Sequence, residues 1–303
     1  METISTAIVG KGALGLLYAD IITTHDPKHE VFFVMDNARY ERHRNEHVVI
    51  NDVPCTFTTL PLDQAKKADL VLVATKTTGL IDALDIIEPL LKPDTLVVSV
   101  LNGITSEEYL AQRFGWDRVV PCVAQGMDAM RFGSTMTYSQ LGALHIGRFE
   151  QTSAKSYERL RAMFDVLGIP SVEEADIRYR MWAKFLLNVG LNQTCAVYNY
   201  TYADVLKEGE ANRVMIAAMR EVLALAQAEQ VALTEAELNH MVDLISTLDP
   251  QATPSMGQDR INHNLSEVDE FAGEVIRRAE KHHLLVPTNR YLYDCMKRIE
   301  AQY

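Results

Sequence analysis

A lysine and two asparagines recur at every fourth position in an otherwise apolar segment. Lys184, Asn188 and Asn192 lie within the stretch MWAKFLLNVGLNQTCAV, residues 181–197. At about 100° per residue of an α-helix, positions four apart differ by only about 40°, so the three side chains share one stripe. Burying an unpaired polar group costs about 1–3 kcal/mol, so a stripe among apolar neighbours needs partners. A bound ligand is one such partner; an exposed polar face, or amides that tie helices together, is the alternative.

The lysine of this stripe is the residue best suited to move a proton. An apolar environment disfavours the charged form of a lysine and lowers its pKa, so we expect Lys184 to donate a proton near neutral pH. A carbonyl group that accepts hydride develops negative charge on oxygen, which a nearby ammonium stabilises. The hydride would then have to come from a cofactor.

A glycine-rich loop near the N-terminus offers a site for such a cofactor. Gly10, Gly12 and Gly15 follow an apolar strand and open an apolar helix at residues 13–25. The first glycine permits a tight turn, the second lets a pyrophosphate approach the backbone, and the third allows close helix–strand packing. The phosphates then meet N–H groups at the positive end of the helix. This context predicts dinucleotide binding.

The residue that ends the second predicted strand bears on the choice of dinucleotide. It is Asp36, and a carboxylate there would bind a ribose 2′-hydroxyl and repel the 2′-phosphate of NADP. Arg39, Arg42 and Arg44 follow closely and could hold that phosphate instead, or form a solvated helix face. The sequence leaves this choice open.

The first half of the chain alternates strands with helices. Apolar runs predict strands at residues 6–9, 30–35, 69–75, 95–101, 119–123 and 143–146, with a helix near 78–91. Continuous apolar runs suit parallel strands covered on both faces, so the alternation predicts an α/β fold with a Rossmann-type doubly wound sheet.

The second half shows helical periodicity almost throughout. Helices are expected near residues 153–167, 178–197, 212–229, 234–247, 266–282 and 287–301. We therefore predict a dinucleotide-binding domain over residues 1–172 and an all-helical substrate and catalytic domain over residues 173–303.

Composition limits the classes of partner. The formal net charge of −12 argues against broad nucleic-acid binding, although a local cationic pocket can still attract an anionic substrate. The four cysteines lie far apart and no His cluster has metal-ligand spacing, so no metal site is expected. No secretory signal and no membrane-length apolar run is present. These features predict a cytoplasmic protein without membrane partners, and they leave a monomer and a homodimer both open.

A second polar segment follows a proline-marked break. Ser255 with Gln258, and Ser266 with Asp269, have the spacing of capping boxes, in which case Glu267 would only favour a helix dipole. Its interest depends on which helices lie beside it.

Together these motifs resemble the ketopantoate reductase (2-dehydropantoate 2-reductase) family over most of the chain. The loop containing Ala13 and Leu14 resembles the family's GxGALG motif, and Lys76 resembles its cofactor-side lysine. Asn102, followed by a glycine, is similar to the asparagine that meets nicotinamide and substrate. The pattern WxKFxxNxxxN at residues 182–192 is similar to its catalytic-lysine helix. The segment SMxQD, with a Ser-Glu pair at Glu267, resembles its last polar segment.

The resemblance implies a role for each matching residue. Lys184 would be the general acid, and Glu267 would hold the reacting oxygen or the product hydroxyl. The expected substrate-binding residues are Asn102, Lys184, Asn188, Asn192, Ser255 and Glu267. The expected cofactor-binding residues are Gly10, Lys11, Gly12, Ala13, Leu14, Gly15, Asp36, Arg39, Lys76, Asn102 and Ala124.

The resemblance also implies an activity and a fold. The activity is NADPH-dependent reduction of ketopantoate to pantoate in pantothenate biosynthesis, with NAD left open by Asp36. The helical domain would resemble that of 6-phosphogluconate dehydrogenase, with the site in the cleft between the two domains. One alternative is a reductase or dehydrogenase of another 2-keto or β-hydroxy acid, and another is a non-catalytic NADP(H)-sensing module. Lys184 argues against a sensor, because a sensor needs no proton donor.

Overall fold

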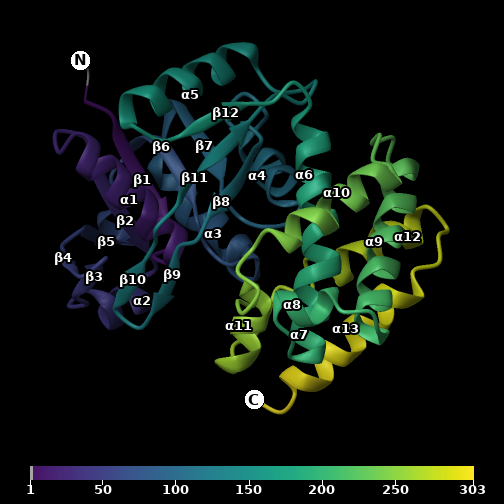
Figure 1. Cartoon of the computed structure of the whole chain (residues 1–303). Helices are drawn as coiled ribbons and strands as arrows, with labels where there is room; N and C mark the ends of the chain where they lie inside the picture. The colour runs from purple at the N-terminus through teal and green to yellow at the C-terminus, as the bar shows by residue number, and fades with distance from the viewer. Residues whose placement is uncertain (1–2) are drawn as a thin grey trace. The chain divides into compact units, whose positions relative to one another are not determined.

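The chain forms two compact units that divide after Ile177. The computed structural model describes residues 3–303, coloured along the chain in Figure 1. The expected boundary after Val172 falls inside strand β12 (Ser171–Glu173), which pairs in parallel with β11 (Leu141–Ile146). Backbone pairing therefore keeps this segment in the first unit.

The first unit is built on a five-stranded parallel sheet in the order β5-β2-β1-β6-β7. The strands are β1 (Ser5–Val9), β2 (Glu30–Met35), β5 (Thr58–Pro61), β6 (Ala68–Val73) and β7 (Leu91–Ser99). The predicted doubly wound sheet is confirmed. The strand order reverses between β1 and β6, and sheets of this kind bind ligands at the carboxyl ends of the strands beside that point.

Helices cover both faces of this sheet, which is why its strands are apolar throughout. On one face lie α1 (Ala13–His25) and α5 (Ala154–Leu167), and on the other α3 (Leu80–Ile87) and α4 (Ser106–Phe114). Adjacent residues of one strand serve opposite faces, since Phe33 packs with the first pair of helices and Phe32 with the second. Short 3-10 turns, Thr77–Gly79 and Glu88–Leu90, flank α3, so the α-helix expected at 78–91 is shorter.

Two small sheets complete the first unit. One has the order β4-β3-β10-β9 and the other β12-β11-β8. Their remaining members, with the short helices of this unit, are β3 (Val48–Ile50), β4 (Val53–Cys55), β8 (Cys122–Met127), β9 (Met130–Phe132), β10 (Thr135–Thr137), α2 (Asn37–His43) and the 3-10 turn Leu62–Gln64. The strand expected at 119–123 is displaced, because Val119 forms only an isolated bridge to Val97 and β8 starts later.

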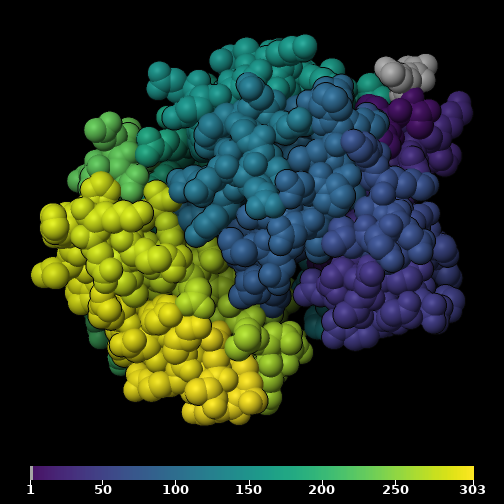
Figure 2. Space-filling model, turned by 180° about the vertical axis from the view of Figure 1, so that it is seen from behind, coloured from purple at the N-terminus to yellow at the C-terminus, as the bar shows by residue number. Residues whose placement is uncertain are grey.

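The second unit is helical. Its elements are α6 (Ile177–Leu187), a π-helical segment (Asn188–Asn192), α7 (Gln193–Tyr198), α8 (Tyr202–Leu206), α9 (Glu210–Ala228), α10 (Glu235–Ser246), α11 (Ser255–Ile261), α12 (Ala272–Lys281) and α13 (Pro287–Glu300). Helix α9 is central, because the π segment, α7, α8, α10, α12 and α13 all contact it. The yellow C-terminal part, which includes α13, is exposed at the surface in Figure 2.

Three features of the second unit differ from expectation. Helices α8 and α11 were not predicted, and the helix expected at 266–282 begins only at Ala272, after a run of turns.

Among residues 3–303, no helix combines the length and apolarity needed to cross a bilayer. Within the same residues, no group of His, Cys, Asp or Glu side chains is arranged to hold a metal ion.

Candidate active site

The glycine loop is shaped by the absence of side chains. Gly10 has a φ of +112°, and a Cβ there would lie 2.4 Å from the carbonyl of Ala74 and 2.6 Å from the nitrogen of Thr75. A Cβ on Gly15 would lie 2.0 Å from the carbonyl oxygen of Gly10. Only glycine fits these two positions. The backbone of Gly10, just after β1, contacts the backbone that follows β6, and the backbone of Gly15, in α1, contacts Gly10 itself.

The start of α1 suits an anionic ligand. Gly12 is its N-cap and provides no side-chain bond to the N–H groups of the first turn. The hydroxyl of Thr75 is buried beside this loop and has no hydrogen-bond partner among residues 3–303. A dinucleotide phosphate would satisfy both the helix N–H groups and such a hydroxyl, so the residues present fit the cofactor.

Lys11, inside the loop, is held by two charged side chains. Its ammonium lies 3.5 Å from a carboxylate oxygen of Glu46. Arg131 of β9 donates to the carbonyl oxygen of Lys11 and also to Glu46. Burial lowers the pKa of Lys11, and the attraction of Glu46 opposes that shift. No motif pointed to Arg131, which is 120 residues away from the loop in the chain.

Asp36 follows β2 and serves as the N-cap of α2. Its carboxylate accepts a hydrogen bond from the backbone N–H of Arg39 at 2.8 Å, and the Arg39 guanidinium lies 3.9 Å from it. No residue of α2 is buried, and Arg44 pairs with Glu41 at 3.2 Å. The arginines that follow Asp36 thus belong to an exposed helix and its C-cap.

Three further residues expected at the cofactor lie in or just after strands of the first unit. Lys76 comes after β6 and is exposed, and Asn102 follows β7 and is half-buried. Since β1, β6 and β7 are parallel neighbours, the glycine loop, Lys76 and Asn102 all lie at the carboxyl edge of one sheet. Ala124 is buried in β8, in a different sheet, where it pairs with Leu144.

In the second unit, the polar stripe crosses a change of helix type. Lys184 is half-buried on α6, and Asn188 and Asn192 are 8% and 7% exposed at the two ends of the π segment. The continuous α-helix expected at 178–197 is therefore wrong at its centre. Four residues of an α-helix rotate the chain by slightly more than one full turn about the helix axis, whereas four residues of the wider π turn rotate it by slightly less. The rotation offset between Asn188 and Asn192 therefore opposes the offset between Lys184 and Asn188, so the three side chains stay aligned.

Local contacts explain why the helix widens here. A Cβ on Gly190 would lie 2.3 Å from Cγ of Met219 on α9, so the missing side chain lets the segment approach that helix. The backbone N–H of Gln193 bonds to the carbonyl of Gly190, while its side-chain amide donates to the carbonyl of Val189 at 2.7 Å. The side chain thus takes the acceptor that an α-helical backbone would have used.

Gln193 also links three elements of the second unit. Its amide oxygen accepts from the backbone N–H of Ala272 at 2.8 Å, and its amide nitrogen lies 3.3 Å from Oδ1 of Asn289. Gln193 and Asn289 are fully buried. Gln193 was not among the predicted site residues, although a glutamine next to Asn192 on an apolar helix was the available signal.

The second polar segment is brought to the same part of this unit. Helix α11 packs against α7 and the π segment. Pro254 occupies its N-cap and Ser255 is its exposed first residue, so Ser255 is not a helix cap. Likewise Ser266 is not the cap of α12, which starts at Ala272; its hydroxyl donates to Glu300 at 2.6 Å.

Glu267 is 8% exposed in the turns that precede α12. The end of these turns packs on the lysine helix, since the rings of Phe271 and Phe185 lie 6.4 Å apart. Helix α6, the π segment, α11 and the Glu267 turns therefore belong to one packed group of elements.

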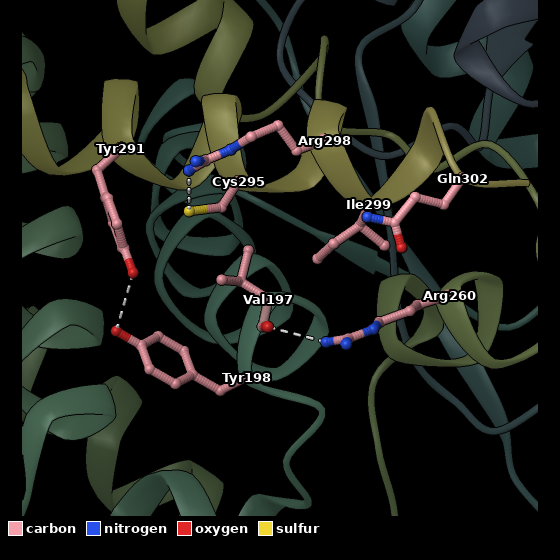
Figure 3. A pocket seen from close by; sticks show the side chains of 8 residues that line it. All are labelled: Val197, Tyr198, Arg260, Tyr291, Cys295, Arg298, Ile299 and Gln302. Atoms are coloured by element: carbon pink, nitrogen blue, oxygen red, sulfur yellow. Dashed lines mark hydrogen bonds between the residues drawn. The ribbon is translucent and has the colours of Figure 1, made fainter.

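A cavity of about 360 Å³ in the second unit contains none of the predicted residues. Figure 3 shows Arg260 there, which donates to the carbonyls of Ala196 and Val197 at 2.5 and 2.8 Å, and Tyr198, whose hydroxyl lies 3.4 Å from that of Tyr291. Arg260 thus closes the carboxyl end of α7. We assign this cavity no part in the chemistry, because neither the lysine nor the asparagines line it.

Comparison with known families decides what this arrangement belongs to. Residues 6–151 match the family model described as ketopantoate reductase PanE/ApbA, and residues 176–300 match the model of its C-terminal part. The chain belongs to the ketopantoate reductase family. It is therefore an oxidoreductase that uses NAD(P)H, and the predicted resemblance is confirmed.

Relatives cover nearly the whole chain. A 2-dehydropantoate 2-reductase of Streptococcus pyogenes is 24% identical over 305 residues, which span 97% of each protein. D-mandelate dehydrogenase, solved with NADH and anilino(oxo)acetate, has a TM-score of 0.88 and 21% identity, with 99% of both chains covered. A PanE/ApbA family ketopantoate reductase from Ralstonia eutropha JMP134 has a TM-score of 0.84 and 24% identity, again over 99% of both chains. The ketopantoate reductase family thus shares the fold of a Rossmann-type unit followed by a helical unit.

Proposed function

We propose that this protein reduces ketopantoate to pantoate with NADPH. The observation that carries the proposal is the stripe of Lys184, Asn188 and Asn192, which stays aligned where the helix widens and lies among buried neighbours. The curated relatives that act on 2-dehydropantoate support the same substrate. Pantothenate biosynthesis is then the pathway, and a cytoplasmic location is expected.

The residues of the second unit would carry the proton chemistry. The bound cofactor supplies the hydride for the keto carbon. Lys184 would hold the keto oxygen by a charge-assisted hydrogen bond, stabilise the developing alkoxide and deliver the proton that completes the hydroxyl group. Asn188, Asn192 and Ser255 would orient the keto acid, and Glu267 would hold the hydroxyl side of the product.

In the first unit, the glycine loop and Lys76 would bind the phosphates and Asn102 would orient the nicotinamide. Each follows a neighbouring parallel strand, which supports a single extended ligand along that edge. The direct test is an assay of reduced-cofactor oxidation by absorbance, with ketopantoate and each of NADPH and NADH. Turnover of ketopantoate supports the proposal, and tight cofactor binding without turnover of any keto acid would favour a sensor instead.

A second candidate is an NADH-dependent reductase of another 2-keto acid. Asp36 favours it, because its carboxylate stands after β2, where it would repel a 2′-phosphate. The structural similarity to D-mandelate dehydrogenase bound to NADH points the same way. A panel of ketopantoate and phenylglyoxylate with both cofactors separates the candidates. In the second case Asp36→Ser should shift the NADPH-to-NADH preference by about tenfold or more, since it removes a charge near the ribose.

A homodimer is part of the same proposal. The second unit exposes large apolar side chains, among them Ile261, Leu265 and Leu285, which another copy could cover. Light scattering would detect the dimer as twice the 34.1 kDa mass of the chain.

A further inference from the structure

Arg131 ties a small β-sheet to the glycine loop. Its guanidinium donates to the carbonyl of Gly133 at 2.9 Å through Nε, to the carbonyl of Lys11 through Nη1 and to Glu46 through Nη2. The two Nη atoms of the planar guanidinium thus donate to one backbone oxygen of the loop and to one carboxylate. We propose that Arg131 is a positioning residue, which orients the Lys11–Gly12 peptide toward the pyrophosphate of the cofactor.

The geometry of the peptide bond supplies the reason. The described chain has no cis peptide, so the carbonyl of Lys11 and the N–H of Gly12 lie in one plane and point in opposite directions. When Arg131 fixes the carbonyl on its own side, the N–H of Gly12 must face away from Arg131. The negative end of this peptide is then turned from the ligand and its positive end is available at the start of α1.

Glu46 completes the arrangement from a third segment. Its carboxylate bonds to Arg131 and lies 3.5 Å from the ammonium of Lys11, so the loop is held by its backbone and by its side chain. The side chains of Lys11, Glu46 and Arg131 are 9%, 17% and 19% exposed, which places these charged bonds in a partly desolvated region where they are strong. A flexible glycine loop gains a fixed shape from these bonds before any ligand arrives.

The inference rests on nicotinamide dinucleotide binding, as the proposed function does, and is independent of the keto acid. The test measures the Kd of the full-length protein for NADH, NADPH and ADP-ribose by titration. Arg131→Met should raise all three Kd values by a similar factor of about ten or more, because all three ligands share the pyrophosphate. At saturating cofactor, kcat and the KM for the keto acid should stay near those of the wild type.

Arg113→Met is the matched control, since Arg113 pairs with exposed carboxylates on α3 and the following 3-10 turn, and it should leave every Kd unchanged. Arg131→Lys keeps the positive charge but lacks the planar guanidinium with its two Nη donors, so it should give intermediate Kd values. This variant replaces the Met variant in the titration if the Met variant does not fold. Wild-type Kd values in the folded Arg131 variants would overturn the proposal, and so would a loss confined to NADPH, which would indicate a 2′-phosphate contact. Failure of the wild type to bind any of the three ligands would instead contradict the proposed function.

Discussion

Lys184 lies half-buried on α6, one turn before two buried asparagines. We predict that Lys184→Ala lowers kcat by at least about a hundredfold, the usual scale of a lost proton donor, because no other ammonium on this stripe can replace it. The Kd for the reduced cofactor should stay within about twofold, since the glycine loop belongs to the other unit. Steady-state kinetics and cofactor titration measure the two effects.

Lys281→Ala is the control for this experiment, because Lys281 is an exposed lysine of α12 and its loss should leave kcat unchanged. Near-normal turnover in the Lys184 variant would show that another group donates the proton.

Single residues differ in how well the sequence revealed them. Lys184 and the two asparagines were visible because polar residues at a helical period stand out in an apolar run. Arg131 was not, because its contacts with Lys11 and Glu46 depend on the pairing of β10 with β3, which brings the β9–β10 hairpin next to residues far away in sequence. The functional-residue assignments themselves stay predictions until the variants are measured.

At the scale of elements, the π segment depends on one buried side chain. Gln193→Leu keeps the volume but leaves the carbonyl of Val189 and the N–H of Ala272 without their partner. Each unsatisfied buried group costs about 1–3 kcal/mol, so the two groups together predict a loss of about 2–6 kcal/mol in the free energy of unfolding. Urea denaturation measures it.

Gln227→Leu provides the comparison, since Gln227 is exposed on α9 and its replacement should change stability by less than about 0.5 kcal/mol. Equal stabilities of the Gln193 and Gln227 variants would mean that the buried amide does not hold the wide turn.

Helix α4 carries a buried glutamate that makes the free energy of unfolding depend on pH. Glu107 is 2% exposed and accepts a hydrogen bond from Ser106, and burial raises its pKa from 4.5 to about 7. Between these values the folded chain retains a proton that the unfolded chain loses, so stability falls as the pH rises from about 4.5 to 7. We predict that Glu107→Gln removes this loss and is more stable than the wild type at pH 8, by at most about 3 kcal/mol.

Denaturation of both proteins at pH 5 and pH 8 tests this sign. The stability difference should be small at the lower pH and larger at the higher one. Glu208→Gln, at an exposed position, should show no such trend. A constant difference at both values would mean that Glu107 titrates normally.

Helices and strands with a clear pattern of apolar residues were predictable from the sequence, and elements of only a few residues were not. The helix at 13–25 and the strand at 30–35 have the predicted bounds, because each is a continuous apolar run between clear breaks. Strands β3, β4, β9 and β10 have three residues each, too few for a period to emerge. The π segment escaped notice since its side chains fit an α-helical pattern equally well.

At the scale of the whole molecule, cofactor binding should appear as stability of the first unit. A ligand at about 100 times its Kd adds about 2.7 kcal/mol, which raises the Tm of a unit of this size by about 5–10 °C. Gly10→Ala should abolish this shift, because its φ of +112° and the contact with Ala74 leave no room for a methyl group. Thermal melts with and without reduced cofactor provide the measurement.

Gly209→Ala serves as the reference, since the nearest atom to its added Cβ would be 3.9 Å away, and it should keep the full shift. An undiminished shift in the Gly10 variant would place the cofactor elsewhere on the chain.

The division into two units was predictable from the change of periodicity near the middle of the chain. The division after Ile177 lies five residues beyond the expected boundary after Val172, because β12 is a short polar strand that joins the first unit through pairing with β11. A boundary drawn from local sequence cannot include such a long-range partner.

The widened turn has a consequence for chain length. It holds a residue more than an α-helical turn, so a single deletion between Asn188 and Asn192 would restore regular helix. Gln193 and the helix after it would keep nearly the same direction, because four residues of an α-helix and five residues of a π turn each complete little more than one full turn. The wide turn therefore accommodates one extra residue locally, and the packing of α7 tolerates a change of chain length here that a regular helix would not.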